Sequence, residues 1–309
     1  MQSNRIEGTT PGETNSVRAL LSSDLPELLG LLEWVDAQPE REVFAPLARS
    51  IDDLKWECRN KPAFVQTGRE GETLAYCGLS PYRDGLVLEG PLCERTDPTA
   101  VLRAAVEKAR EAPDRVLYAF CARANAPVRH ALTGVGFEAF GGTTFYMLRR
   151  AGHAPQGAPL PEGALVVSAD ELSLEDYQRL YKDSDDAWSA RLSWTADEYR
   201  QHFASPSVAL VALGVPGPSG RVRPVAHCEL ELDGEEAEIA YLGVSASYRG
   251  HGWGRAVLDR GLALAFAQSG LETVTARAHD HEDNAVRLYN SRGFTLVRDI
   301  ISFSQEVVT

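Results

Sequence analysis

The chain has 309 residues, of which 44% are hydrophobic and 24% are charged. This composition is typical of globular proteins and excludes a disordered or fibrous chain. The formal charge is −13, from 44 acidic and 31 basic residues, which argues against nucleic-acid and anionic-membrane binding, since both require a positive field. The length predicts two domains, because one domain usually contains about 100–200 residues.

Cysteine usage and hydropathy indicate the compartment. The five cysteines are scattered and have no CxxC spacing, so neither a disulfide framework nor a metal site is expected: Cys58, Cys77, Cys93, Cys121 and Cys228. The first residues lack the apolar segment of a signal peptide. The longest apolar stretch, 208–215, is far shorter than the ~20 residues needed to span a bilayer. We expect a cytoplasmic protein.

The first half of the chain is predicted to hold a flexible tail at 1–15 and a domain at 16–150. Its expected elements are, in order, a strand at 17–20, a helix at 25–35, strands at 63–67, 73–79 and 85–92, a helix at 98–112, a strand at 115–121, a helix at 128–133 and a final strand after Phe137. The segment 151–163 contains three prolines and three glycines and is predicted to be a linker.

The second domain, 164–309, is predicted to have the order β-α-α-β-β-β-α-β-α-β. Its expected strands are 165–167, 208–215, 225–232, 237–244, 273–278 and 294–308, and its expected helices are 172–182, 194–203 (capped by Ser193 or Thr195), 255–268 and 284–291. Both halves place an asparagine before a Gly-Phe pair: Asn125 with Gly136-Phe137, and Asn284 with Gly293-Phe294. We interpret this as a tandem duplication.

The most informative segment is the strand 237–244 and the sequence RGHGWG that follows at 249–254. Alternate glycines allow backbone N–H groups to approach an anion without obstruction by Cβ atoms. The helix that follows adds free N–H groups and about half a positive charge at its N-terminus. The pattern predicts a pyrophosphate cradle. It is neither a P-loop, which ends in GK[ST], nor a GxGxxG dinucleotide fingerprint.

This segment resembles motif A of the GNAT superfamily of N-acetyltransferases, whose Arg/Gln-x-x-Gly-x-Gly/Ala loop is matched by Arg249, Gly252 and Gly254. The later NAVRLYNSRGF, at 284–294, resembles motif B. The resemblance implies an α/β (α+β) fold class with two tandem GNAT folds, each a mixed, mostly antiparallel central sheet flanked by helices. It also implies acetyl-CoA as acyl donor and no metal. The two-domain plan is similar to that of mycothiol synthases, which acetylate a cysteinyl amine; antibiotic, polyamine and protein amines are alternatives.

The resemblance also implies roles for individual residues. The backbone of Leu242 and Val244 would hold the pantetheine arm and the thioester carbonyl, and Tyr289 would act as the general acid near the departing sulfur. The alternative for Tyr289 is a packed core aromatic. The implied cofactor-binding residues are Leu242, Gly243, Val244, Arg249, Gly250, His251, Gly252, Trp253, Gly254, Arg255 and Asn284.

A base is also required, because an amine of pKa ~10.4 is almost fully protonated at pH 7. The resemblance implies that Glu238 is this base, and Glu229 and Glu231 are the alternatives. The alternative for Glu238 itself is a solvent-exposed strand carboxylate without a catalytic role. The expected reaction is direct attack of a primary amine, on a small molecule or peptide, on the bound thioester. A non-catalytic acyl-CoA-binding sensor with the same pocket is the alternative from another class. Trp188, Trp194 and Tyr199 lie in the segment that covers the acceptor in this superfamily, with a role in specificity or in core packing as the alternatives.

The first half departs from the motif where the glycine loop should be. Residues 93–99 contain no glycine and two acidic residues, and Pro98 lacks an N–H group. Leu132 stands at the position of Tyr289. We therefore interpret the first half as a degenerate GNAT-like domain that has lost cofactor binding.

Overall fold

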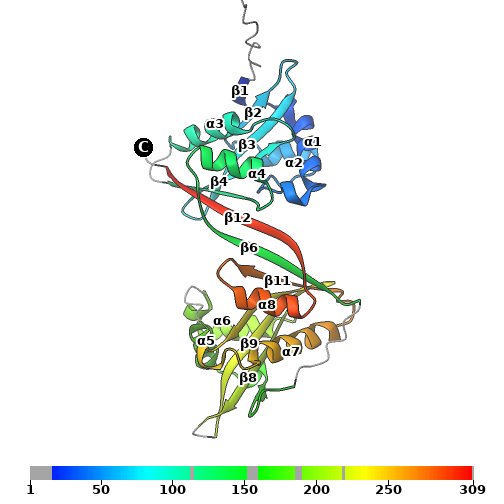
Figure 1. Cartoon of the computed structure of the whole chain (residues 1–309), viewed down its shortest axis with the longest axis vertical. Helices are drawn as coiled ribbons and strands as arrows, with labels where there is room; N and C mark the ends of the chain where they lie inside the picture. Colours follow the sequence, from blue (N-terminus) through cyan, green and yellow to red (C-terminus); the bar gives the residue numbers. More distant parts are fainter. Residues whose placement is uncertain (1–15, 112–114, 152–158, 185–189, 218–219, 308–309) are drawn as a thin grey trace, which may run out of the picture. The chain divides into compact units, whose positions relative to one another are not determined.

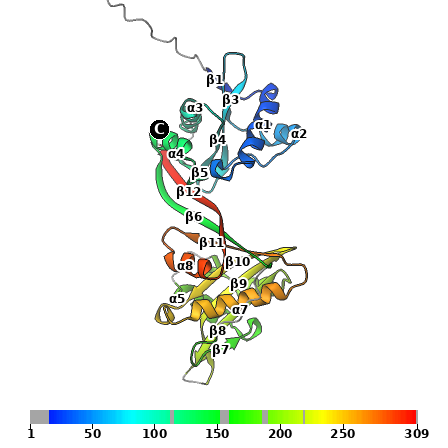
Figure 2. The same ribbon diagram turned by 45° about the vertical axis from the view of Figure 1, so that its right-hand side comes forward.

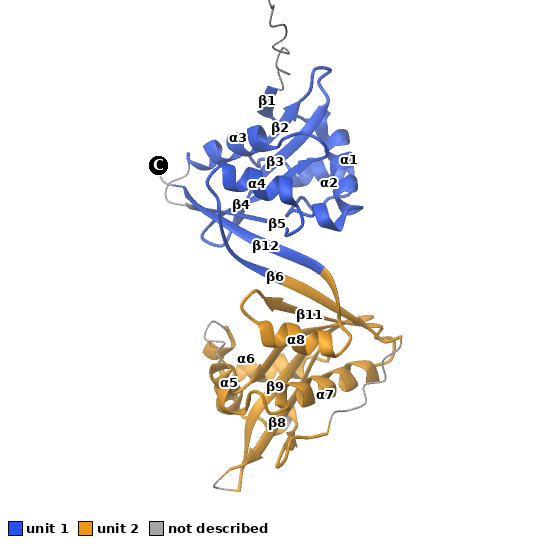
Figure 3. Ribbon diagram, in the orientation of Figure 1, with its two compact units in different colours: residues 1–143, 298–309 blue, residues 144–297 orange. Residues whose placement is uncertain are grey.

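The computed structural model of the chain describes residues 16–111, 115–151, 159–184, 190–217 and 220–307, whose elements are shown in two views (Figures 1 and 2). The chain forms two compact units (Figure 3): unit 1 comprises Met1–Thr143 and Arg298–Thr309, and unit 2 comprises Thr144–Val297. The predicted tail and the linker residues 152–158 lie outside the described residues. No helix of the described part is long and apolar enough to cross a membrane.

Unit 1 has the strand order β1-β2-β3-β4-β5-β12, in which β4 and β5 are parallel and the other neighbouring strands are antiparallel. Its strands are β1 (Ser16–Ala19), β2 (Ala63–Thr67), β3 (Thr73–Tyr82), β4 (Gly85–Cys93), β5 (Arg115–Ala122) and, from residue 298, β12 (Thr295–Val307). Its helices are α1 (Leu25–Asp36), α2 (Ile51–Glu57), α3 (Thr99–Ala109) and α4 (Ala126–Gly134).

Unit 2 has the strand order β6-β11-β10-β9-β8-β7, in which β10 and β11 are parallel and β7 to β10 are antiparallel neighbours. Its strands are β6 (Glu138–Arg149, from residue 144), β7 (Leu165–Val167), β8 (Val208–Pro216), β9 (Val222–Asp233), β10 (Glu236–Val244) and β11 (Thr273–His279). Its helices are α5 (Leu174–Asp183), α6 (Ala196–Ala204), α7 (Trp253–Ala267) and α8 (Asp283–Ser291).

The element order predicted for the second half matches the structure, and side chains cap the first two of its helices, α5 and α6. Thr195 and Glu198 form a capping box at α6, which satisfies two free N–H groups of the first turn. The helix α7 lies across β8 and β9 (Figure 2). It packs so closely that a Cβ on Gly261 would lie 2.7 Å from Cys228 Sγ. Cys228 is therefore a core residue, and burial raises its thiol pKa to about 12.

The last strand of each half pairs outside that half. In unit 1, β12 pairs with β5 from Ile300 opposite Ala122 to Val307 opposite Arg115. In unit 2, β6 neighbours β11, and Tyr146 belongs to the hydrophobic core. The compact units consequently divide within β6 and β12, whereas the sequence places the division at the proline-rich segment. Periodicity identifies a strand, but it does not identify the strand's partner.

Candidate functional site

The parallel strands β10 and β11 of unit 2 separate shortly after they begin. They pair only over Glu236–Glu238 and Thr273–Thr275. At the same place, the register between β10 and β9 shifts between Ile239 and Tyr241, which marks a bulge that bends β10. The β11-facing edge of β10 beyond the bulge therefore has no strand partner among the described residues. This open edge is called the β10 slot below.

Backbone groups of β10 point into this slot. The N–H of Ser245 donates to Val225 O on β9 at 2.8 Å. Because successive residues of a strand direct their N–H groups to opposite sides, the N–H groups of Val244 and Leu242 face away from β9 and toward the slot. An extended ligand can pair with such an edge as an added strand does. These are the two residues to which the motif resemblance assigns the pantetheine arm.

The glycine loop closes one end of the β10 slot. Gly250 and Gly252 have φ of +76° and +84°, a region that favours glycine, and Gly252 is the N-cap of α7. Arg249 fastens the loop, because its Nε donates to Val244 O at 3.0 Å. Its backbone N–H donates to Ala246 O at 3.3 Å. Of the loop amides assigned to pyrophosphate, that of Arg249 is thus already engaged, and the free ones begin at Gly250.

The first turn of α7 supplies further amides. Trp253 is 4% exposed and packs edge-on against Tyr248, so only its backbone is available. A Cβ on Gly254 would lie 3.5 Å from Val244 Cγ2 and 3.6 Å from Leu288 Cδ2, so a larger side chain would force α7 away from β10 and α8. The helix N-terminus thereby stays beside the slot, where its free N–H groups and dipole attract an anion.

The rim of the loop is polar and positively charged. The side chains of Arg249, His251 and Arg255 are exposed. Guanidinium groups bind phosphate oxygens through charge-assisted hydrogen bonds, so this rim complements the field of the α7 N-terminus. Asn284, in the first turn of α8, is also exposed, and its amide has no hydrogen-bond partner in the described part of the chain.

Tyr289 lies inside the core of unit 2. It is 4% exposed, and its ring lies 5.8 Å from that of Tyr146 and 5.3 Å from that of Phe294. Burial raises the pKa of Tyr289 well above its usual value, so the phenol is neutral and carries its proton at pH 7. Its hydroxyl has no hydrogen-bond partner among the residues described. Tyr289 is thus a packed aromatic with an uncommitted proton donor.

Glu238 and Glu231 lie on one face of the sheet, directly opposite each other on β10 and β9. Glu238 is part-exposed, and its Oε1 lies 2.9 Å from Arg277 Nη2. The Glu231 side chain is 54% exposed. Both carboxylates are therefore accessible at the point where β10 and β11 separate.

Glu229 is fully buried on the same face of β9, and its carboxylate is fully engaged. Tyr177 and Tyr181 donate at 2.5 and 2.9 Å, Arg191 Nη2 at 2.5 Å, and His202 Nε2 lies at 3.0 Å. Burial alone would raise the pKa of Glu229, but these hydrogen bonds and the Arg191 charge lower it to about 2. Glu229 consequently anchors the surrounding helices, and Glu238 and Glu231 are the better-placed carboxylates for proton removal.

A buried histidine completes this face and was not predicted from the sequence. His227 lies opposite Gly243, is fully buried and stacks on Tyr241 at 5.0 Å. A Cβ on Gly243 would lie 2.8 Å from His227 Cε1, so this glycine makes room for the ring. Neither ring nitrogen has a hydrogen-bond partner among the residues that the structure describes, and burial lowers the pKa of His227 to about 4.

The spacing of these residues in the sequence indicates that they share a face. His227, Glu229 and Glu231 alternate along β9, and Tyr177 and Tyr181 are four residues apart on α5, so each set shares a face. Trp194 stacks on Tyr177 at 6.0 Å, while Trp188 lies outside the described residues. Within the described ranges, no group of three or more His, Cys, Asp or Glu side chains is arranged to hold a metal ion.

Lowering the pH from 7 to 5 is expected to cost the fold about 2 kcal/mol through His227. The unfolded histidine titrates near pH ~6.5 and the folded one near 4. Between these values only the unfolded chain binds the proton, so stability falls as the pH falls. Urea unfolding at both pH values should show this loss in the wild type and in a His251→Gln control. A loss of equal size in His227→Gln would contradict the assignment.

Comparisons with known proteins agree with this geometry. Residues 173–294 match the model of the acetyltransferase (GNAT) family, and no curated protein sequence matches the chain. The chain is similar to a GCN5-related N-acetyltransferase from Sphaerobacter thermophilus, with a TM-score of 0.64, 16% identity, and 97% of this chain and 98% of that chain covered.

Two further solved structures cover nearly the whole chain. One is a tandem GNAT protein from the clavulanic acid biosynthesis pathway, with a TM-score of 0.53, 14% identity, and 96% of this chain and 99% of that chain covered. The other is a GCN5-related N-acetyltransferase from Kribbella flavida, with a TM-score of 0.50, 17% identity, and 92% and 93% covered. At these identities the similarity concerns the fold. The predicted fold class, two tandem GNAT folds with mixed, mostly antiparallel sheets, is confirmed.

Proposed function

Because the C-terminal half of the chain carries a GNAT-family acetyltransferase domain, we propose that the protein is an acetyl-CoA-dependent N-acetyltransferase acting on a primary amine of a small molecule or peptide. The family supports acetyl transfer from acetyl-CoA in general. The amine acceptor and the residue roles belong to the proposal. The observation that carries it is the β10 slot, which ends at a glycine loop and a helix N-terminus.

The two parts of the site match the two parts of acetyl-CoA. The amide-bearing pantetheine arm would pair with the backbone of Leu242 and Val244, whose N–H groups face the slot. The pyrophosphate would bind the amides of 250–255, and Arg255 would add a positive charge beside it. Such a site binds an anion with backbone donors that are already in place, so little ordering is required on binding.

The chemistry is then assigned to Glu238, beside the bulge of β10, and to Tyr289 on α8. Glu238, directly or through a water molecule, removes a proton from the ammonium group of the acceptor. The amine nitrogen attacks the thioester carbonyl carbon, the C–S bond breaks, and Tyr289 donates its proton to the departing sulfur. The new amide nitrogen loses its surplus proton, which returns to the Tyr289 phenolate directly or through water. No covalent enzyme intermediate is needed. Positioning of the amine and the thioester supplies much of the acceleration.

Replacing Tyr289 with phenylalanine is expected to lower kcat roughly a hundredfold, within the usual range for loss of a general acid. The variant keeps the ring that packs against Tyr146 and Phe294 and removes only the unpartnered hydroxyl. Acetyl-CoA affinity should not change. Thiol release with a panel of amines measures the rate, and calorimetry measures the affinity.

Tyr146→Phe is the matched control, because it removes a hydroxyl from the neighbouring buried ring. Equal rates for wild type and Tyr289→Phe would remove the tyrosine from the mechanism. Tight acetyl-CoA binding without thiol release on any amine would instead favour the acyl-CoA-binding sensor.

A further inference from the structure

Unit 1 contains the counterpart of the β10 slot. Its parallel strands β4 and β5 pair only at Leu86–Leu117 and Val87–Tyr118 and then separate. The register between β4 and β3 shifts between Tyr76 and Gly78, as the register between β10 and β9 does in unit 2. The fold therefore creates a second opening between the diverging strands, called the β4 slot below.

The β4 slot is occupied by the chain itself, on the side of β5. Phe44 N–H donates to Phe120 O at 3.0 Å, and Ala122 N–H donates to Glu42 O at 2.7 Å. Val43, between them, forms an antiparallel bridge with β5 and is buried. Residues 42–44 thus pair, as a short strand, with the edge of β5 from which β4 has separated.

The same segment also contacts β4. Gly90 N–H donates to Phe44 O at 2.6 Å, so residues 42–44 bridge the two diverging strands. Glu42 is fastened further by Arg298, whose Nε donates to its Oε2 at 3.0 Å. In unit 1 an amide at the bulge of β4 is therefore hydrogen-bonded to the chain itself, whereas the β11-facing edge of β10 has no strand partner among the described residues of unit 2.

The asparagines that precede the Gly-Phe pairs show the same contrast. Asn125, just before α4, is 3% exposed, and its Nδ2 donates to Arg41 O at 2.9 Å. Asn284 lies within the first turn of α8, two residues after its N-cap Glu282. It is exposed and carries the assignment to the cofactor arm. In unit 1 the asparagine holds the inserted segment.

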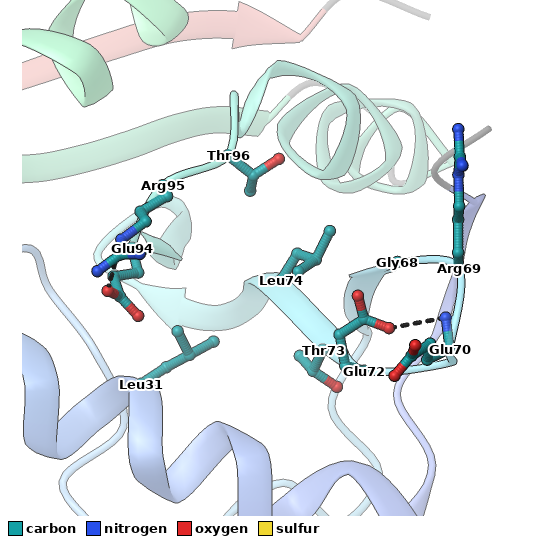
Figure 4. Close-up of a pocket in the computed structure, with 10 residues that line it drawn as sticks. All are labelled: Leu31, Gly68, Arg69, Glu70, Glu72, Thr73, Leu74, Glu94, Arg95 and Thr96. Carbon is teal, nitrogen blue, oxygen red and sulfur yellow. Dashed lines mark hydrogen bonds and ion pairs between the residues drawn. The ribbon is translucent and has the colours of Figure 1, made fainter. Parts of the chain in front are cut away.

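The helix that follows β4 has fewer free N–H groups at its start than α7 has. The N-cap of α3 is Pro98, which has no N–H group, and the N–H of Thr99 already donates to Asp97 Oδ1 at 2.9 Å. A pocket of about 480 Å³ adjoins the preceding segment (Figure 4). It is lined by three glutamates and two arginines, namely Glu70, Glu72, Glu94, Arg69 and Arg95. Carboxylates outnumber guanidinium groups, so the pocket does not favour a polyphosphate.

We propose that residues 41–44 are a built-in ligand of unit 1, which fills the β4 slot as the pantetheine arm would fill the β10 slot. Unit 1 is then closed to CoA thioesters, and each chain binds one acetyl-CoA, in unit 2. The comparison with acetyl-CoA rests on the proposed function, whereas the occupation of the β4 slot does not.

Residue-resolved hydrogen exchange on the whole chain tests the proposal. The amides of Phe44, Gly90 and Ala122 should exchange slowly, with or without acetyl-CoA. Those of Leu242 and Val244 should exchange quickly in the free protein and slow when acetyl-CoA is added. Fast exchange of the first three amides in the free protein would overturn the built-in ligand.

A proline variant and a titration complete the test. Phe44→Pro removes the N–H that bonds to Phe120, so Gly90 and Ala122 should lose protection. The control Leu47→Pro also removes one hydrogen bond, to Glu57, and should leave them protected. Calorimetry of the wild type should give one acetyl-CoA per chain. Two sites per chain would overturn this inference and leave the proposed function standing. No acetyl-CoA binding, together with protected Phe44, Gly90 and Ala122 amides, would overturn the proposed function and leave this inference standing.

Discussion

Replacing Gly252 with glutamate is expected to weaken acetyl-CoA binding at least a hundredfold, which corresponds to ~2.7 kcal/mol, while unit 2 stays folded. Gly252 caps α7 with φ of +84°, and no other atom lies within 4 Å of the position its Cβ would take. The new side chain has room, but its carboxylate would stand where the pyrophosphate charge is expected. Like charges at the helix N-terminus repel each other at close range.

Gly270→Glu is the matched control for Gly252→Glu. Gly270 has nearly the same φ, +87°, and equally open surroundings, but it follows the C-terminal end of α7. Both variants should lose a similar ~1–3 kcal/mol of stability from backbone strain, measured by thermal unfolding. Calorimetry should show acetyl-CoA binding lost only in Gly252→Glu. Loss in both variants would attribute the effect to strain, and retention in both would separate the loop from cofactor binding.

The glycine loop was predictable because its signal is local. The loop has a glycine where positive φ is needed, a strand before it and a helix after it, all close together in the sequence. Strand alternation, which directs the N–H groups of Leu242 and Val244 to the same side, is equally local. The element order of the second half follows from the same short-range periodicities and caps. Helix α2 was not predicted, because it is short and buries only Leu54.

Features that depend on distant pairing were not predictable in the same way. Glu229 meets Tyr177 across 52 positions of the chain, and Phe44 meets Phe120 across a longer separation. In neither pair does a sequence motif identify which residue the other one contacts. From Pro98 and the missing glycines, the sequence predicts that the first half does not bind pyrophosphate. It gave no sign that residues 42–44 fill the opening.

The two halves thus reach opposite outcomes from one strand plan. In each, a register shift and a short parallel pairing leave an edge of backbone groups to be satisfied, since unpaired buried polar groups are costly. Unit 1 satisfies the edge with its own chain. In unit 2 no described residue pairs with the edge, and the proposed function assigns it to a ligand. Asn125 caps α4 and already has its partner in the carbonyl oxygen of Arg41, whereas Asn284, within the first turn of α8, is exposed.

A fragment comprising residues 164–309 is expected to be unable to fold, although it contains every motif of the proposed site. It lacks Tyr146 and Leu148, which are 4% and 3% exposed in the core of unit 2. It also lacks Arg150, whose Nη2 donates to the carbonyl oxygens of Phe266 and Gln268 at 2.7 Å each and so caps the end of α7. Losing two large core side chains costs roughly 5 kcal/mol or more, which is comparable with the whole stability of a domain.

The fragment 144–297 tests the same argument from the other side. It keeps β6 beside β11 and the Arg150 cap, and it omits the β12 residues that pair with β5 in unit 1. Circular dichroism should show cooperative unfolding for 144–297 and none for 164–309, and only the former should bind acetyl-CoA. The reverse result would mean that the proline-rich segment, and not the strand pairing, marks where an independent folding unit begins. Since β11 without β6 presents an unpaired edge, the shorter fragment is also expected to aggregate.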